Sequence, residues 1–165
     1  CKVLFKGARR DNMKWGKKDA SDEEIYDALN MAQAREFVND KDQGLMLHID
    51  QGGRNLSGGQ RQRLTIARAL VRRPEILIMD DSASALDFAT DARLRKAIRQ
   101  GTKDMTVFIV SQRATTIKQA DLILVLDEGA LAGMGKHKEL LNSCEVYREI
   151  CLSQLSREEV ERDEQ

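Results

Sequence analysis

The spacing of apolar residues predicts two helices in the first half of the chain. Ser21 stands three residues before a glutamate, the arrangement of a capping box, and the apolar positions that follow recur at helical intervals. A helix is therefore expected from Ser21 to about Val38. A second helix is expected from about Ser57 to Arg72, with its apolar residues on one face. The polar, glycine-containing stretch between the two helices predicts a loop.

The second half of the chain alternates short apolar runs with helical patterns. Strands are expected over residues 76–79, 106–110, 121–126 and 130–132, and helices over residues 89–100, 136–141 and 145–155. The first two strands are almost wholly apolar, which is typical of buried strands. Strands that alternate with helices predict an α/β fold with a mostly parallel sheet. The acidic segment after Leu155 is expected to be frayed helix or disorder.

The composition of the chain mainly excludes certain classes of protein and kinds of site. The 165 residues suffice for one compact domain, and 27 basic and 27 acidic side chains give a net charge of +0. This balance excludes a nucleic-acid binder that acts through bulk charge. The apolar runs are far shorter than the ~20 residues of a membrane-spanning helix. The cysteines form no C-x-x-C pair, which indicates reduced thiols, and the two histidines lie too far apart to favour a metal site.

The start of the second helix has the composition of a phosphate site. The segment reads Leu56-Ser57-Gly58-Gly59-Gln60 and continues with Arg61-Gln62-Arg63. Glycine lets the backbone approach a ligand closely, and the first turn of a helix presents N–H groups without intrahelical partners. The positive end of the helix dipole lies at the same place. The pentapeptide therefore predicts an anion site suited to a phosphate, although a serine and two glycines alone would be typical of an ordinary helix start.

Polar side chains follow the first two predicted strands. Asp80 and Asp81 would lie at the carboxyl end of the first strand, where α/β sheets bind ligands. A carboxylate in this position can hold Mg²⁺ directly or through water, and its neighbour can orient or deprotonate a water molecule. Gln112 comes just after the second strand, where a side chain could meet a γ-phosphate. A further segment carries no chemical signal by itself: Ser84-Ala85-Leu86-Asp87.

The order and spacing of these segments resemble the ATP-binding cassette (ABC) ATPases. The resemblance extends from about Val3 to Gln154, and its ends look like those of the exporters in this family. It implies a truncated, P-loop NTPase-like α/β cassette, with a helical signature subdomain and part of the core sheet. On this interpretation the parts are a partial nucleotide-binding domain over residues 1–155, divided into a helical subdomain (22–72) and a core sheet with flanking helices (73–155), and an acidic tail (156–165).

The resemblance also implies a role for each candidate residue. The signature, which binds ATP held by a second nucleotide-binding domain, comprises Leu56, Ser57, Gly58, Gly59 and Gln60. The D-loop, which lies at the dimer interface and couples the two sites, comprises Ser84, Ala85, Leu86 and Asp87. Asp80 would be the Mg²⁺ ligand, Asp81 would orient water, and Gln112 would sense the γ-phosphate. The implied cofactors are ATP and Mg²⁺.

The sequence departs from the family pattern in three places. It contains no G-x-x-x-x-G-K-[ST] motif, the P-loop that cradles ATP phosphates. Asp81 stands where the family usually has glutamate, and a side chain shorter by ~1.5 Å would orient water poorly. Gln112 stands where the family has histidine, and an amide cannot exchange a proton near neutrality. We therefore expect a degenerate half-site beside an intact signature, and little ATP binding or hydrolysis by the chain alone.

The resemblance leaves three functional classes open. The first is the ATPase portion of a membrane ABC exporter at the cytoplasmic face of the plasma membrane, with this chain as the degenerate-site subunit of a heterodimer. Its partners would be a second nucleotide-binding domain and a transmembrane domain, with no nucleic acid. The second class is a non-transport ABC ATPase, and the third is a soluble pseudo-ATPase that presents its signature to a partner. The exporter-like ends favour the first class.

Overall fold

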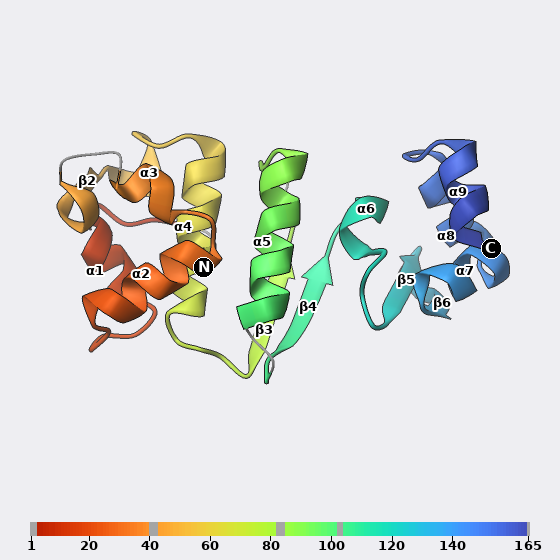
Figure 1. Ribbon diagram of the computed structural model, residues 1–165, viewed down its shortest axis with the longest axis horizontal. Helices are drawn as coiled ribbons and strands as arrows, with labels where there is room; N and C mark the ends of the chain where they lie inside the picture. Colours follow the sequence, from red (N-terminus) through yellow and green to blue (C-terminus); the bar gives the residue numbers. More distant parts are fainter. Residues whose placement is uncertain (1–2, 40–42, 82–84, 102–103, 165) are drawn as a thin grey trace. The chain divides into compact units, whose positions relative to one another are not determined.

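The computed structural model describes residues 3–39, 43–81, 85–101 and 104–164 of the chain. The chain divides into two compact units, Cys1–Phe108 and Ile109–Gln165, and each is described by itself. Helices are interspersed with short strands along the sequence (Figure 1). The predicted α/β class is therefore confirmed.

The first unit begins with helical segments and continues with a strand, a helix and a strand. Its elements are β1 (Gly7–Ala8), α1 (Arg9–Lys14), α2 (Asp22–Met31), α3 (Arg35–Asn39), β2 (His48–Ile49), α4 (Gly58–Leu70), β3 (Ile76–Asp80), α5 (Phe88–Gly101) and β4 (Thr106–Val110). The last two residues of β4 belong to the second unit. Two 3₁₀ turns flank β2, Gly44–Met46 and Gln51–Gly53. The helices predicted from Ser57 and over residues 89–100 are confirmed as α4 and α5.

Helices α2 and α4 pack against each other in the first unit. Ile25 and Leu29 of α2 and Leu64 of α4 are fully buried. Because these side chains lie on one face of each helix, the apolar spacing in the sequence predicts both helices. Burial of one such side chain contributes ~1.5–3 kcal/mol. This contact therefore stabilises α4 and with it the turn at its N-terminus.

A break separates α2 from α3, where the sequence predicts one continuous helix to residue 38. Gln33, which lies between them, has a φ of 57°. The amide of Gln33 donates to the carbonyl of Asn30 (3.0 Å), and the amide of Ala34 donates to the carbonyl of Leu29 (2.7 Å). This is a Schellman ending, which usually has glycine in the left-handed position. The prediction of one helix was wrong because no glycine or proline marks the break.

The stretch between α3 and α4 contains more structure than the loop that its composition predicts. β2 pairs antiparallel with β1, and Gly7 lies opposite Ile49. The buried guanidinium of Arg9 donates from Nη1 to the carbonyls of Val38 and Gly44, both at 3.2 Å. Burial also lowers the pKa of this guanidinium below its ordinary value. These contacts with α1 order a segment that has no regular apolar pattern of its own.

β3 and β4 form a two-stranded sheet. The amide of Thr106 at the start of β4 donates to the carbonyl of the residue before β3 (2.8 Å), so the two strands begin side by side. Buried and exposed side chains alternate along β3: Leu77 and Met79 are buried, whereas Ile76 and Ile78 are 59% and 67% exposed. The expectation of a buried strand was therefore correct for only one face of β3.

The second unit consists of a β-hairpin and a small helical cluster. Its elements are α6 (Ala114–Ile117), β5 (Ile123–Asp127), β6 (Ala130–Gly135), α7 (His137–Ser143), α8 (Glu145–Leu152) and α9 (Arg157–Glu164). Their shared core includes Val125, Leu140, Tyr147 and Cys151. Among the described residues each sheet has two strands, and β1–β2 and β5–β6 are antiparallel. The mostly parallel sheet that the sequence predicts is therefore not found in these residues.

The acidic tail forms a packed helix, α9. The amide of Glu159 donates to Oγ of Ser156 (3.2 Å), and the amide of Ser156 donates back to the carboxylate of Glu159 (3.0 Å). Val160 is buried, and Asp163 lies 3.3 Å from Nε2 of His137 in α7. The expectation of a frayed or disordered end was wrong because these contacts hold the tail on the rest of the unit. Among the described helices, none combines the length and apolarity needed to cross a membrane.

Candidate functional site

The N-terminus of α4, at the predicted signature, is a helix turn closed by a capping box. Ser57 caps the helix, because its Oγ accepts the amide of Gln60 (3.2 Å) while its own amide donates to Oε1 of Gln60 (3.0 Å). The bond from Gln60 occupies an acceptor site of the hydroxyl and not its proton. Ser57 is exposed. Its hydroxyl can therefore donate to an anion in front of the helix without releasing the cap.

Gly58 and Gly59 bring α4 close to the segment before α5. A Cβ atom at Gly59 would lie 3.2 Å from the carbonyl oxygen of Ala85 and 3.5 Å from Leu86. A Cβ atom at Gly58 would lie 3.5 Å from the Cβ of Ala85. The contact at Gly59 is tight, so this close approach favours glycine. Gly58 and Gly59 also carry no side chains that would cover their own amides, which suits a phosphate.

Arg63 anchors the turn on its other side. Its Nε donates to the carbonyl of Gly59 (3.3 Å), and its Nη1 donates to the carbonyl of Gln33 (2.7 Å) at the end of α2. The guanidinium also lies over the ring of Phe37, 4.8 Å from the centroid. Burial lowers the pKa of this guanidinium below its ordinary value. Arg63 thus fixes the position of the signature turn relative to α2 and α3.

Asp80 and Asp81 lie at the carboxyl end of β3, as predicted, and both are exposed. Asp81 has a φ of 46°, an uncommon backbone conformation outside glycine that is often found at functional sites. The described residues contain no group of three or more His, Cys, Asp or Glu that could hold a metal ion. Mg²⁺ commonly uses one or two carboxylates together with phosphate oxygens and water. The pair therefore fits a magnesium ion that binds together with a nucleotide.

Asp87 makes a contact that the motif alone did not reveal. Its Oδ1 accepts the amide of Thr90 (2.9 Å), so Asp87 caps the start of α5. Hydrogen bonds from the amide and hydroxyl of Thr90 lower the pKa of Asp87 below its ordinary value. Of the other predicted D-loop positions, Ala85 is exposed, Leu86 is buried, and Ser84 lies outside the described residues. The role of Asp87 at a dimer interface stays a prediction.

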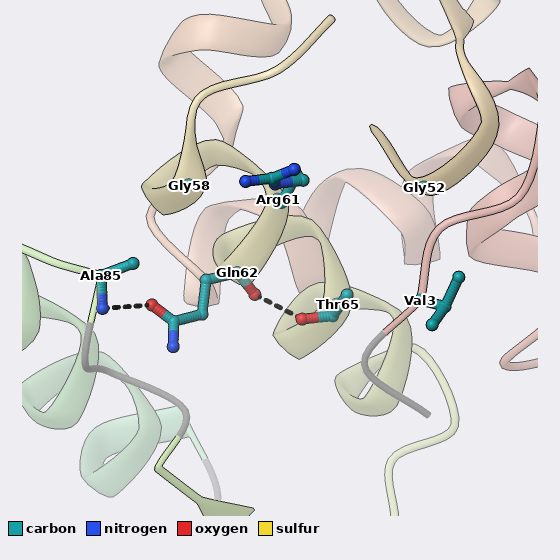
Figure 2. Close-up of a pocket in the computed structure, with 7 residues that line it drawn as sticks. All are labelled: Val3, Gly52, Gly58, Arg61, Gln62, Thr65 and Ala85. Carbon is teal, nitrogen blue, oxygen red and sulfur yellow. Dashed lines mark hydrogen bonds between the residues drawn. The ribbon is translucent and has the colours of Figure 1, made fainter. Parts of the chain in front are cut away.

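Gln62, for which the sequence pattern predicted no role, joins α4 to both ends of the connection between β3 and α5. Its Nε2 donates to the carbonyl of Asp81 (3.1 Å), and its Oε1 accepts the amide of Ala85 (3.0 Å). Figure 2 shows the contact with Ala85. Gln62 lies four residues after Gly58 and so on the same face of the helix. That spacing is the signal in the sequence that could have identified it.

An open pocket lies beside the signature turn. It has a volume of about 330 Å³ and is lined by Val3, Gly52, Gly58, Arg61, Gln62, Thr65 and Ala85 (Figure 2). Next to Gly52, Gly53 has a φ of 70°, and a Cβ atom there would lie 2.9 Å from the side chain of Arg61. Glycine at position 53 therefore leaves room for the stem of Arg61. Arg61 is exposed, and its charge adds positive potential close to the N-terminus of α4.

Gln112 belongs to the second unit and is exposed just after β4. Its carbonyl accepts a hydrogen bond from Nε2 of Gln154 (2.7 Å), whose Oε1 accepts the amide of Ala114 (2.9 Å). Gln154 thus fixes the backbone around Gln112 within its own unit. The structure brings the signature turn, the carboxylates after β3 and Asp87 together in the first unit, while Gln112 is part of the second.

Comparison with known proteins identifies this arrangement. Residues 3–84, which contain the signature turn and both carboxylates after β3, match the family described as "ABC transporter". The chain belongs to the ABC transporter family. The predicted resemblance is thereby confirmed. The chain is 46% identical over 156 residues to YfiB of Bacillus subtilis, described as an uncharacterized ABC transporter ATP-binding protein.

Other members of the ABC transporter family support the same relationship. The chain is 44% identical over 147 residues to YheI of Bacillus subtilis, described as a probable multidrug resistance ABC transporter ATP-binding/permease protein. These matches cover 94% of this chain and 27% of YfiB, and 89% of this chain and 25% of YheI. A solved structure of a bacterial Atm1-family ABC exporter with ATP bound has a TM-score of 0.89 and 35% identity, covering 94% of this chain and 27% of that one. The chain therefore spans about a quarter of the length of its curated relatives.

Proposed function

We propose that this chain is the ATP-binding part of a membrane ABC exporter, in which ATP-driven association of two nucleotide-binding domains is coupled to transport. The observation that carries this proposal is the capped turn at Ser57–Gln60, which lies in one unit with the exposed carboxylates of Asp80 and Asp81. YheI, by its description, combines ATP binding with a permease, and the structural neighbour is an exporter with ATP bound. Both relatives support transport over the other two functional classes.

The site residues divide the work as follows. The hydroxyl of Ser57 and the first-turn amides of α4 bind the γ-phosphate of ATP that is held by a second nucleotide-binding domain. Asp80 holds Mg²⁺ directly or through water. When bound, Mg²⁺ neutralises part of the phosphate charge. Asp81 orients the attacking water, and Gln112 senses the γ-phosphate. Asp87, which caps α5, lies at the dimer interface and couples the two sites.

We further propose that the half-site formed by Asp81 and Gln112 is degenerate. Asp81 has a shorter reach than glutamate, and Gln112 cannot exchange a proton, so each would weaken hydrolysis. The intact signature would then complete the competent site of a different subunit. The assembly would include a transmembrane domain and lie at the cytoplasmic face of the plasma membrane. Without a P-loop motif, these 165 residues alone would hydrolyse little ATP.

ATP hydrolysis by the assembled protein tests the proposed function. We expect Mg²⁺-dependent hydrolysis when this chain is assembled with its nucleotide-binding partner and membrane domain in vesicles, and no more than background hydrolysis by the isolated chain. Transport would be measured in the same vesicles as ATP-dependent movement of a reporter substrate across the bilayer. An assembly that folds, yet neither binds nor hydrolyses ATP, would contradict the proposal.

Restoring the family residues tests the degenerate half-site. The double variant Asp81→Glu with Gln112→His is expected to raise turnover at its own half-site by ~10-fold or more, because a displacement of about 1 Å can cost ~10²-fold in rate. Turnover is measured in an assembly whose partner half-site has been inactivated, with each single variant as a control. Unchanged turnover in the double variant would mean that neither residue limits hydrolysis.

A further inference from the structure

The side-chain amide of Gln62 uses both of its hydrogen-bonding groups on the connection from β3 to α5. Nε2 donates to the carbonyl of Asp81 (3.1 Å), and Oε1 accepts the amide of Ala85 (3.0 Å). An amide carries a donor and an acceptor on one planar, uncharged group. A carboxylate could keep only the bond from Ala85, and an ammonium group could keep only the bond to Asp81. The two partners together therefore specify an amide at this position.

The contact of Gln62 continues the contact made by the signature turn. Gly58 lies one helical turn before Gln62, and the space beside Gly58 and Gly59 is occupied by Ala85 and Leu86. The first two turns of α4 thus present one continuous face to the segment before α5. A displacement of this part of α4 has to move Ala85 with it or break the hydrogen bond.

Asp81 is the partner with the most strained backbone. Its φ of 46° belongs to the left-handed region, which is uncommon outside glycine, although aspartate adopts it more readily than most residues. The bond from Gln62 to its carbonyl helps to hold this conformation, and the backbone conformation in turn sets the direction in which the carboxylate leaves the chain. A substitution at Gln62 is therefore expected to change the direction of the Asp81 carboxylate, although Gln62 bonds only to the Asp81 backbone.

We propose that Gln62 is a positioning residue that couples the signature turn to Asp81. A phosphate that binds at Ser57 and the first-turn amides fixes the position of α4. Through its two hydrogen bonds, Gln62 then fixes the positions of Asp81 and Ala85 relative to α4. The water-orienting carboxylate of this half-site then responds to the nucleotide in the other one. The proposal rests on the proposed ATPase function and adds to it a physical connection between the two half-sites within one chain.

The experiment compares two substitutions at Gln62 in the assembled ATP-hydrolysing protein. Gln62→Met is similar in size but loses both hydrogen bonds, whereas Gln62→Glu keeps only the bond from Ala85. We expect kcat at the half-site of Asp81, measured in an assembly whose partner half-site has been inactivated for hydrolysis, to fall by ~10-fold or more in both variants. The KM for ATP is expected to change less than twofold, and the dependence of rate on ATP to lose cooperativity. Gln100→Met, at an exposed glutamine of α5, is the matched control and is expected to behave like the wild type.

Hydrogen exchange at the amide of Ala85 measures whether its hydrogen bond to Gln62 is intact, independently of ATP hydrolysis. Exchange is expected to be faster than wild type in Gln62→Met and unchanged in Gln62→Glu and Gln100→Met. If the wild type hydrolyses ATP and Gln62→Met keeps its kcat within twofold, the coupling is refuted and the proposed function stands. If the wild type does not hydrolyse ATP, the proposed function fails and the coupling fails with it. If Gln62→Met does not fold, kcat and Ala85 exchange in Gln62→Glu decide the question.

Discussion

Replacing Ser57 with alanine is expected to remove two roles of one hydroxyl group. The oxygen accepts the amide of Gln60 at 3.2 Å, and loss of such a helix cap costs about 1 kcal/mol. In a unit of roughly 100 residues this lowers the Tm by ~4–8 °C. The hydroxyl proton is free of this bond and would donate to a phosphate. Losing a hydrogen bond to a charged group costs ~1.5–3 kcal/mol, so ATP engagement at the signature should weaken by ~10- to 150-fold.

The chain offers a matched control for the first of these roles. Ser21 caps α2 in the same unit with the same geometry, since its Oγ accepts the amide of Glu24 at 3.2 Å and its amide donates to the Glu24 carboxylate at 3.0 Å. Ser21→Ala is therefore expected to lower the Tm as much as Ser57→Ala and to leave ATP hydrolysis unchanged. Ser57→Asp separates the roles in the opposite direction, because aspartate is a good helix cap but repels a phosphate.

The assay combines thermal unfolding with steady-state ATP hydrolysis of the assembled protein. Ser57→Ala should lose both stability and activity, Ser21→Ala only stability, and Ser57→Asp only activity. Equal losses of activity in Ser21→Ala and Ser57→Ala would show that the hydroxyl of Ser57 acts through helix stability alone. Full activity in Ser57→Asp would refute phosphate binding at this turn.

Two further predictions concern stability. Gly16→Ala should destabilise the first unit by ~1–3 kcal/mol, measured by urea unfolding, because the new Cβ would lie 2.2 Å from the backbone oxygen of Arg68 in α4; an unchanged midpoint would contradict this packing. Burial raises the pKa of Asp163, but hydrogen bonds from His137 and Lys118 outweigh it and lower that pKa below its ordinary 3.8. Asp163 thus stabilises the second unit above about pH 4, and this contribution is lost as pH falls further. The Tm gap between wild type and Asp163→Asn should therefore close below pH 4, and a gap that stays constant would show that this carboxylate does not contribute.

The features that the sequence predicted well are those with local physical causes. α2 and α4 begin directly after Ser21 and Ser57, because a capping box satisfies the first amides of a helix with side chains only three residues away. Asp80 lies at the end of β3 for a similar reason, since the apolar run that forms the strand ends at that residue. Most of the candidate site could be located from the sequence because its parts are contiguous motifs.

The features that were missed depend on contacts between distant segments. Gln62 meets Asp81 and Ala85 about twenty residues further along the chain; its spacing from Gly58 places it on the face of the signature turn but does not name these partners. The helical tail is held by Val160 and Asp163 against residues of other elements, and its acidic composition alone predicted frayed helix or disorder. The turn at Gln33 adopts a left-handed conformation without the glycine that usually announces it.

Among the described helices, α2, α4 and α9 each begin with a capping box made by a serine, and the returning side chain separates α4 from the other two. In α2 and α9 the returning side chain is a glutamate, Glu24 or Glu159, whose pKa is lowered: for Glu24 chiefly by a hydrogen bond from Lys17, and for Glu159 chiefly by one from its capping serine. Those two caps must weaken when acid protonates the carboxylates. In α4 the returning side chain is the amide of Gln60, which does not titrate and brings no negative charge to the positive end of the helix. The signature helix can therefore stay capped in acid and still offer an unneutralised end to an incoming phosphate.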